Sequence, residues 1–265
     1  MKRYLIQFLG LCISVFPLLK VLITVLQRGY VQVLSQKERK VAPAILKDPR
    51  WNENEGYVRV SPEVKIHYVE KGDRTKPLML FLHGFPEFWF SWRFQMEYFS
   101  NDYHCVAMDM RGYNDSDKPK GIEQYGMTHL CNDVKAVIEG MGKTECILVG
   151  HDWGGAVGYG FCTTYPEMVK CYLVCNLPHP KSVRHEQENS LKQKLMSWYM
   201  LFFQCPVIPE FFFTHNDYSI LDDIGKDMKA SNLNEVVEAY KYAFRDRSKI
   251  FVISAYKLLQ INILV

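Results

Sequence analysis

The stretch LVGHDWGG, residues 148–155, decides the fold of this chain. Apolar residues 147–149 read as the end of a buried strand, and glycines stand two positions to either side of Asp152. This G-x-nucleophile-x-G pattern is typical of a sharp strand-to-helix turn that holds its central residue in a cramped backbone conformation. The flanking residues must be small so that strand and helix can approach, and Gly150 and Gly154 meet that demand. We therefore predict that Asp152 is a catalytic nucleophile at a strand end.

An aspartate at this position indicates covalent chemistry at saturated carbon. A carboxylate is ionised at neutral pH and can displace an oxygen or a halide directly, which leaves an alkyl ester on Asp152. Hydrolysis of that ester then needs a water molecule, a general base and an oxyanion hole. The alternatives are a plain glycine-rich turn or a phosphate loop, but a phosphate loop would need Lys-Ser or Lys-Thr after its last glycine, and neither follows.

Length and composition are those of one α/β domain. The chain has 265 residues, 48% of them hydrophobic, which is enough for a sizeable core. Its net charge of +3 is dispersed and gives no basic stripe for nucleic acid. The eight cysteines lack the spacing of a zinc site, so no metal or cofactor is predicted. Several of them lie in apolar runs and are predicted to be buried free thiols: Cys12, Cys105, Cys146, Cys171 and Cys175.

The N-terminus predicts a membrane anchor. Residues 4–26 are almost wholly apolar, and as a helix they would span roughly 35 Å, enough to cross a bilayer core. A cleaved signal peptide is the alternative, but no A-x-A-like site follows the run. We therefore expect residues 1–30 to be a retained single-pass anchor, with the protein in the endoplasmic reticulum membrane. Basic residues on both sides of the run leave the orientation open.

After a polar linker at 31–56, the chain alternates between strand-like and helix-like segments. Strands are expected at 57–60, 64–69, 77–82, 105–108, 146–149 and 171–175, and helices at 87–99, 128–141 and from 154 onward. This alternation predicts a parallel sheet covered on both faces, over residues 57–180. Aromatic-rich, helix-like segments at 190–204, 211–218 and 234–244 then predict a helical cap over residues 181–265, with an ordinary helical appendage as the alternative.

A second loop supports the elbow. The sequence HGFPE, residues 83–87, follows the apolar run at 77–82. In an α/β-hydrolase, the turn after the third strand supplies one of the two oxyanion N–H groups. The predicted donors are the backbone amides of Phe85 and Trp153. Taken alone, HGFPE could be a simple turn with proline at a helix start, but together with the elbow it indicates an oxyanion hole.

Four motifs in this order resemble the epoxide hydrolases of the α/β-hydrolase superfamily: HGFPE, DMRGYNDSDKP at 109–119, GHDWGG at 150–155 and NLPHP at 176–180. The resemblance covers about residues 55–245. It implies an α/β-hydrolase fold with a helical cap, and an enzyme that converts epoxides to vicinal diols through an ester on Asp152, without a cofactor.

The resemblance also implies two cap tyrosines that hydrogen-bond the epoxide oxygen. A phenol with a pKa of about 10 stays protonated at neutral pH and can donate to the departing alkoxide. Tyr199 matches the first of them, by the FFQ-x-P run that follows it. Tyr256 is the candidate for the second, although the family's Gly-Pro turn is absent ahead of it.

The family pattern further implies an acid after the seventh strand and a histidine after the eighth. The sequence given ends at Val265, before either strand, and Asn176 stands where some relatives carry the acid. We therefore expect a core that lacks the last strands, with the sixth strand as an uncovered edge. We also expect that the ester on Asp152 can form but is not hydrolysed.

Two other functions stay open at this point. A haloalkane or haloacetate dehalogenase uses the same aspartate elbow, with the Trp153 indole as a halide ligand. A non-catalytic, membrane-anchored binding protein would use only the cap pocket. The cap aromatics suggest an apolar substrate such as a lipid epoxide: Trp198, Phe202, Phe203 and Phe211–Phe213.

Overall fold

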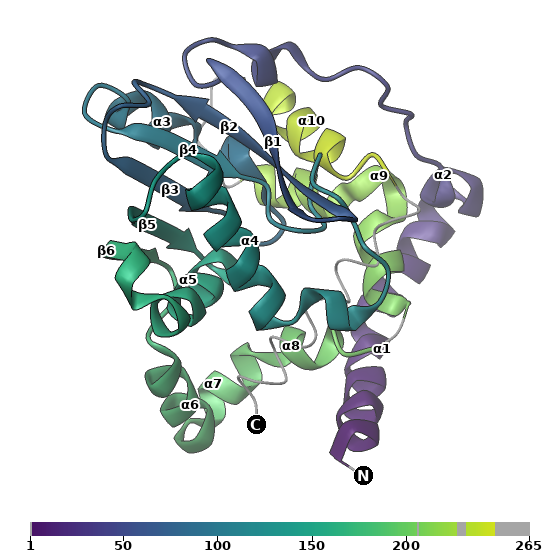
Figure 1. Cartoon of the computed structure of the whole chain (residues 1–265). Coiled ribbons are helices and arrows are strands. Elements are labelled where there is room, and N and C mark those ends of the chain that lie inside the picture. The colour runs from purple at the N-terminus through teal and green to yellow at the C-terminus, as the bar shows by residue number, and fades with distance from the viewer. Residues whose placement is uncertain (1, 206, 227–231, 247–265) are drawn as a thin grey trace.

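The computed structural model describes residues 2–205, 207–226 and 232–246 (Figure 1). Tyr256, the second tyrosine predicted for the cap, lies outside these residues. The described chain forms a layered α/β body with helices gathered at one end of the sheet.

The sheet is mixed. Its order is β1-β2-β4-β3-β5-β6, made of Asn54–Ser61, Val64–Lys71, His104–Met108, Leu78–Leu82, Cys146–His151 and Val169–Cys175 respectively. The pairs β1–β2 and β2–β4 are antiparallel, and the pairs β4–β3, β3–β5 and β5–β6 are parallel. The expected all-parallel sheet is therefore wrong at the end formed by β1 and β2. These two strands are joined by a tight turn, whereas a parallel pair would need a crossover connection of a dozen residues or more.

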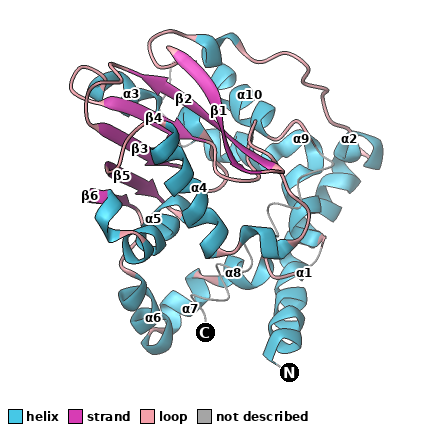
Figure 2. Cartoon of the chain, viewed as in Figure 1, coloured by secondary structure: helices cyan, strands magenta, loops and turns pink. Residues whose placement is uncertain are grey.

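Helices cover both faces of the parallel half (Figure 2). Helices α4 (Met127–Gly140) and α5 (Trp153–Thr164) lie on one face, and α3 (Arg93–Phe99) lies on the other. Every residue of β3 and β4 is buried, as expected of strands covered on both sides. The helix predicted from residue 87 is instead a 3-10 turn, η2 (Trp89–Trp92), followed by α3. Two further 3-10 turns precede α4 and β6: η3 (Ile122–Tyr125) and η4 (Pro166–Met168).

Strand β6 is an edge of the described sheet, where it pairs with β5 alone. Cys171 and Cys175 of this strand are exposed, so their predicted burial is wrong. The predicted burial of Cys12 is also wrong, because this residue is exposed on the N-terminal helix. Cys105 and Cys146, on strands inside the sheet, are buried as predicted.

The cap consists of short helices. These are α6 (Pro180–Asn189), α7 (Leu191–Met196), α8 (Trp198–Phe202), α9 (Ile208–Lys226) and α10 (Leu233–Ala243). The single helix predicted for 190–204 is broken at Ser197, and α6 was not predicted. The last helix matches its prediction within a residue at each end. The division of the chain into domains stays a prediction.

The N-terminal helix α1 (Lys2–Arg28) packs on the cap. It contacts α8 and α9, its Ser14 and Val21 side chains are buried, and Lys20 forms a 3.5 Å ion pair with Asp223 of α9 (Figure 1). In the part of the chain described, no helix combines the length and the apolar character needed to cross a membrane. The predicted anchor is therefore not supported. The endoplasmic reticulum location stays a prediction.

The segment expected to be a polar linker is partly ordered and buried. It contains α2 (Tyr30–Leu34) and the 3-10 turn η1 (Ala44–Lys47). Val33 and Trp51 are almost fully buried, and the Trp51 indole donates to the Ile45 carbonyl at 2.9 Å. Residues 31–56 thus contribute to the packed body.

Candidate active site

Asp152 lies at the junction of β5 and α5 in a strained backbone conformation. Its φ of 49° is in the left-handed region, which an aspartate enters only where the surroundings enforce it. The neighbouring glycines permit the turn. A Cβ on Gly150 would lie 2.8 Å from the Gly154 carbonyl oxygen, and one on Gly154 would lie 2.3 Å from the Leu82 carbonyl oxygen. This is the geometry of a nucleophile elbow, and it presents the carboxylate at the C-terminal end of the sheet.

The loop after β3 reaches the same carboxylate. The Phe85 backbone N–H donates to Asp152 Oδ1 at 3.1 Å, so residues far apart in sequence meet as the motifs predicted. The backbone amides of Phe85 and Trp153 both favour the ionised carboxylate. Backbone amides directed at the reacting group are the kind of donors that an oxyanion hole requires.

Burial raises the pKa of Asp152 above its ordinary value, because water is largely excluded from the carboxylate. The Phe85 and Trp153 amides and the nearby His151 oppose this rise and reduce it. The result is a less hydrated carboxylate held by fixed donors, which is a better nucleophile than one surrounded by water.

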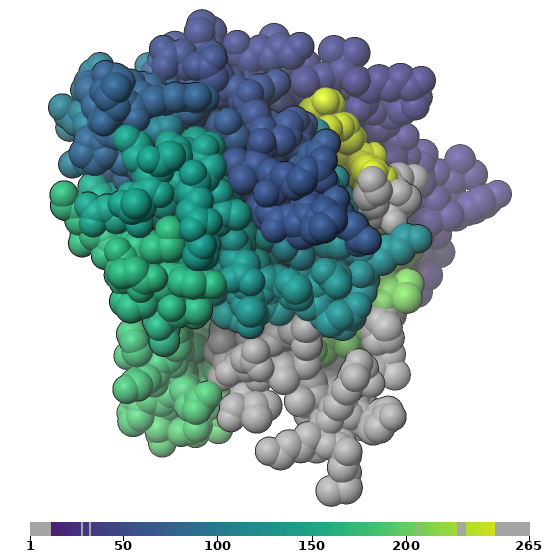
Figure 3. Space-filling model, viewed as in Figure 1, coloured from purple at the N-terminus to yellow at the C-terminus, as the bar shows by residue number. Residues whose placement is uncertain are grey.

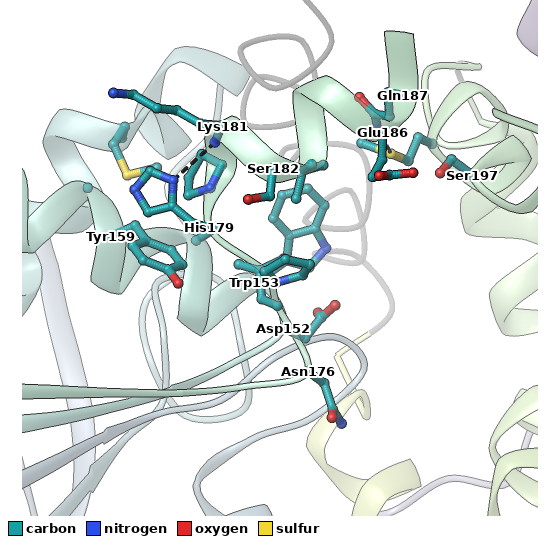
Figure 4. A pocket seen from close by; sticks show the side chains of 18 of the residues that line it. Asp152, Trp153, Tyr159, Asn176, His179, Lys181, Ser182, Glu186, Gln187 and Ser197 are labelled. Atoms are coloured by element: carbon teal, nitrogen blue, oxygen red, sulfur yellow. Dashed lines mark hydrogen bonds between the residues drawn. The ribbon is translucent and has the colours of Figure 1, made fainter. Parts of the chain in front are cut away.

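Tyr199, on α8, lines the same cavity as Asp152. The cavity has a volume of 790 Å³ and lies between α5 and the cap helices. Figure 4 shows Asp152 and Trp153 below Ser182 of α6. Burial and the Asp152 carboxylate raise the pKa of Tyr199, so its phenol is protonated at neutral pH. The cavity thus combines an anionic carboxylate with a neutral phenol.

Comparisons with known proteins agree with this geometry. Residues 77–223 match the family model of the alpha/beta hydrolase fold. The chain is 40% identical over 245 residues to human epoxide hydrolase 4, covering 89% of this chain and 67% of the relative. The chain belongs to the epoxide hydrolases of the α/β-hydrolase superfamily.

Two further relatives extend the comparison. Epoxide hydrolase 1 of Caenorhabditis elegans is 42% identical over 217 residues, which are 80% of this chain and 52% of the worm protein. The crystal structure of an epoxide hydrolase from Bacillus megaterium in complex with an inhibitor superposes with a TM-score of 0.70 at 36% identity. That superposition covers 77% of this chain and 71% of the bacterial one. The chain therefore spans about half to two thirds of the curated relatives it matches.

The loops around Asp152 also hold a polar network that the sequence did not predict. Glu87 Oε2 accepts from the Gly84 backbone N–H at 2.9 Å and lies 2.8 Å from His151 Nδ1. Asn176 Nδ2 lies 3.1 Å from His151 Nε2. The hydrogen bond to Glu87 raises the pKa of His151. Glu87 lies in HGFPE and His151 in GHDWGG, but for these two motifs the sequence predicted roles only for two backbone amides and for Asp152.

Several cap aromatics pack against one another and against the loop after β3. The Phe203 and Phe213 rings lie 5.6 Å and 5.4 Å from the Phe85 ring, and Phe202 of α8 is buried. Trp198 is partly exposed. Phe203 and Phe213 thus pack the cap onto the oxyanion loop, and the suggestion of an apolar substrate stays a prediction. The apolar cavity wall comes from other residues: Met127, Ala156, Leu177, Pro178, Val183 and Met200.

Proposed function

We propose that the cavity binds an epoxide with an apolar substituent and that Asp152 opens the ring. The observation that carries this proposal is the Asp152 carboxylate, held by the Phe85 amide at 3.1 Å, in one cavity with the Tyr199 phenol. Opening an epoxide needs a nucleophile for carbon and a proton for oxygen, and these two groups supply them.

In the first step, a carboxylate oxygen of Asp152 attacks a ring carbon. The bond between that carbon and the ring oxygen breaks, and an ester forms on Asp152. The oxygen leaves as an alkoxide and takes the phenolic proton of Tyr199. The Phe85 and Trp153 amides hold the carboxylate in one orientation, which lowers the entropic cost of the attack.

The second step is hydrolysis of the ester, which needs a base to deprotonate water. Three described histidines lie in the motifs around Asp152, and each has another partner. His179, which lines the cavity, accepts from the Lys181 backbone N–H at its Nδ1 at 3.2 Å. His83 Nδ1 contacts the Gly84 carbonyl and its Nε2 accepts from the Met110 amide. His151 is held between Glu87 and Asn176. We infer that the described residues support ester formation and that the ester persists on them.

The substrate class is proposed from the cavity wall. Apolar side chains near Asp152, among them Leu177 and Met200, favour an alkyl or aryl substituent on the epoxide. A lipid epoxide fits this description. Turnover of only small polar epoxides would contradict it.

Mass spectrometry of the intact chain after incubation with a long-chain alkyl epoxide tests the reaction, with a parallel assay for free diol. We expect an adduct of one epoxide mass that maps to Asp152, with little diol. Asp152→Asn removes the nucleophilic charge and should give no adduct. Steady diol formation would show that a base is present after all, and the absence of both products would contradict the proposed activity.

The same preparation separates the dehalogenase alternative. A chlorinated alkane needs no proton donor for its leaving group, so a dehalogenase would release chloride and tolerate Tyr199→Phe. We expect no chloride release. A protein that only binds ligands would retain the epoxide without a covalent bond and would release it on denaturation.

A further inference from the structure

Helix α9 contains a strained left-handed turn. Asn216, Asp217 and Tyr218 have φ values of 50°, 54° and 60° in succession, so the helix is interrupted there. Three consecutive L-residues in this region are unfavourable, because each Cβ approaches a carbonyl oxygen. Such a turn persists only where contacts outside it hold it in place.

Residues 36–40, here called the N-terminal strap, make those contacts. The Arg39 guanidinium forms a bidentate pair with Asp217, at 2.8 Å from Nη1 to Oδ1 and 2.7 Å from Nη2 to Oδ2. The Lys37 backbone N–H donates to Asp217 Oδ1 at 3.2 Å, and the Gln36 amide donates to the Thr214 carbonyl. The Arg39 side chain is only 5% exposed, although it lies ahead of the hydrolase core in sequence.

The same guanidinium joins α9 to α10. Arg39 Nε donates to Glu238 Oε2 at 3.2 Å, and Lys241 Nζ of α10 lies 2.9 Å from Asp222 of α9. Figure 3 shows the purple N-terminal segment beside the yellow α10. Arg39 hydrogen-bonds both Asp217 and Glu238 and is the least exposed of the three side chains, at 5% against 30% and 37%. Removing it therefore withdraws the main contact of the strap with both helices.

The turn is connected to the nucleophile through aromatic rings. The Tyr218 hydroxyl donates to the Phe244 carbonyl at 2.6 Å, and the Phe244 ring lies 4.8 Å from the Phe213 ring. Phe213 packs on Phe85, whose amide donates to Asp152. The Phe213 ring also lies 5.7 Å from the Tyr218 ring, so on this direct path Phe213 alone separates the left-handed turn from the oxyanion loop.

We propose that Arg39 is a positioning residue for epoxide opening: through the left-handed turn of α9 it holds Phe213 against Phe85, and so keeps the Phe85 amide on Asp152. The catalytic part of this inference rests on the proposed function. The structural part concerns the strap and the oxyanion loop, and it can be tested without substrate.

Arg39→Ala tests both parts, with Arg50→Ala as the matched control. Arg50 also forms a close pair with an aspartate, Asp48, but its side chain is 60% exposed. Hydrogen–deuterium exchange should rise in Arg39→Ala at residues 208–226 and also at 83–88, and should stay unchanged at both in Arg50→Ala. Faster exchange at 208–226 alone, or at neither segment, would overturn the proposal.

The rate of ester formation gives the catalytic readout. In Arg39→Ala, we expect a fall of about tenfold or more in the maximal rate, with little change in the half-saturating epoxide concentration, because the amide is misplaced while the cavity remains. Arg39→Lys, which keeps one charge but not the bidentate pair, should recover part of the rate. An unchanged maximal rate would overturn the positioning role. If the wild-type chain forms no ester, the proposed function fails, and the exchange at 83–88 still decides the role of the strap.

Discussion

At the scale of single residues, the charge of Asp152 sets the pH range of the reaction. Burial raises the pKa of this carboxyl, and only its ionised form attacks carbon. The rate of ester formation should therefore fall as pH drops through that raised pKa, by about tenfold per pH unit below it. Single-turnover mass spectrometry between about pH 4 and pH 9 measures this limb. A limb at or below the ordinary aspartate pKa of about 4 would contradict the burial argument.

Tyr199 makes the second prediction at this scale. Tyr199→Phe removes the proton donor for the ring oxygen and should slow ester formation by about 10²- to 10⁴-fold, the usual contribution of a general acid. Tyr159→Phe is the matched control, since Tyr159 lines the same cavity with its ring packed on Tyr172 and His179. Equal losses in the two variants would show that the cavity shape, and not the phenol of Tyr199, matters.

The residues of the site could be predicted where backbone geometry demanded a residue type. The glycines around Asp152 and the HGFPE turn are each typical of one backbone geometry, so both loops could be located from the sequence. The contacts of His151 and of Arg39 depend on side chains far away in sequence, Glu87 and Asp217, and no local pattern indicates such partners.

At the scale of elements, a buried ion pair fixes the loop after β4 to α4. Arg111 Nε and Nη2 lie 2.8 Å and 2.6 Å from the Asp133 carboxylate, and both side chains are buried. Arg111→Met leaves that carboxylate buried without its partner and should lower the free energy of unfolding by about 3–5 kcal/mol. Lys135→Met, which removes an exposed pair with Glu139 on the same helix, should have little effect. Urea unfolding of both variants measures the difference, and equal midpoints would contradict it.

Elements were predicted well where one physical signal dominated. Strands β3 and β4 are continuous apolar runs, and α4 and α10 have apolar residues at helical spacing. The cap was predicted less well. Helix α6 has no buried residue and therefore no apolar stripe, and the turn inside α9 is imposed by the strap. The antiparallel end of the sheet follows from the short turn between β1 and β2, which the alternation of strands and helices did not indicate.

At the scale of the whole molecule, the β6 edge of the described sheet is the place where we expect the chain to associate with another copy. The strand alternates between partly buried and exposed residues, and Leu173 at its centre is 50% exposed. An edge strand with unpaired backbone groups and an exposed apolar side chain favours pairing with another chain.

Leu173→Lys should therefore reduce self-association of the chain. A charge at the centre of the edge opposes pairing with a second copy, while the interior of the sheet is unchanged. Leu191→Lys is the control, since Leu191 is 72% exposed on α7, away from the strand. Light scattering over a concentration series should show a smaller mean mass for Leu173→Lys than for wild type or Leu191→Lys. If Leu191→Lys lowers the mean mass equally, exposed apolar side chains in general, and not the β6 edge, drive the association. If neither variant changes the mean mass, the β6 edge does not contribute to self-association.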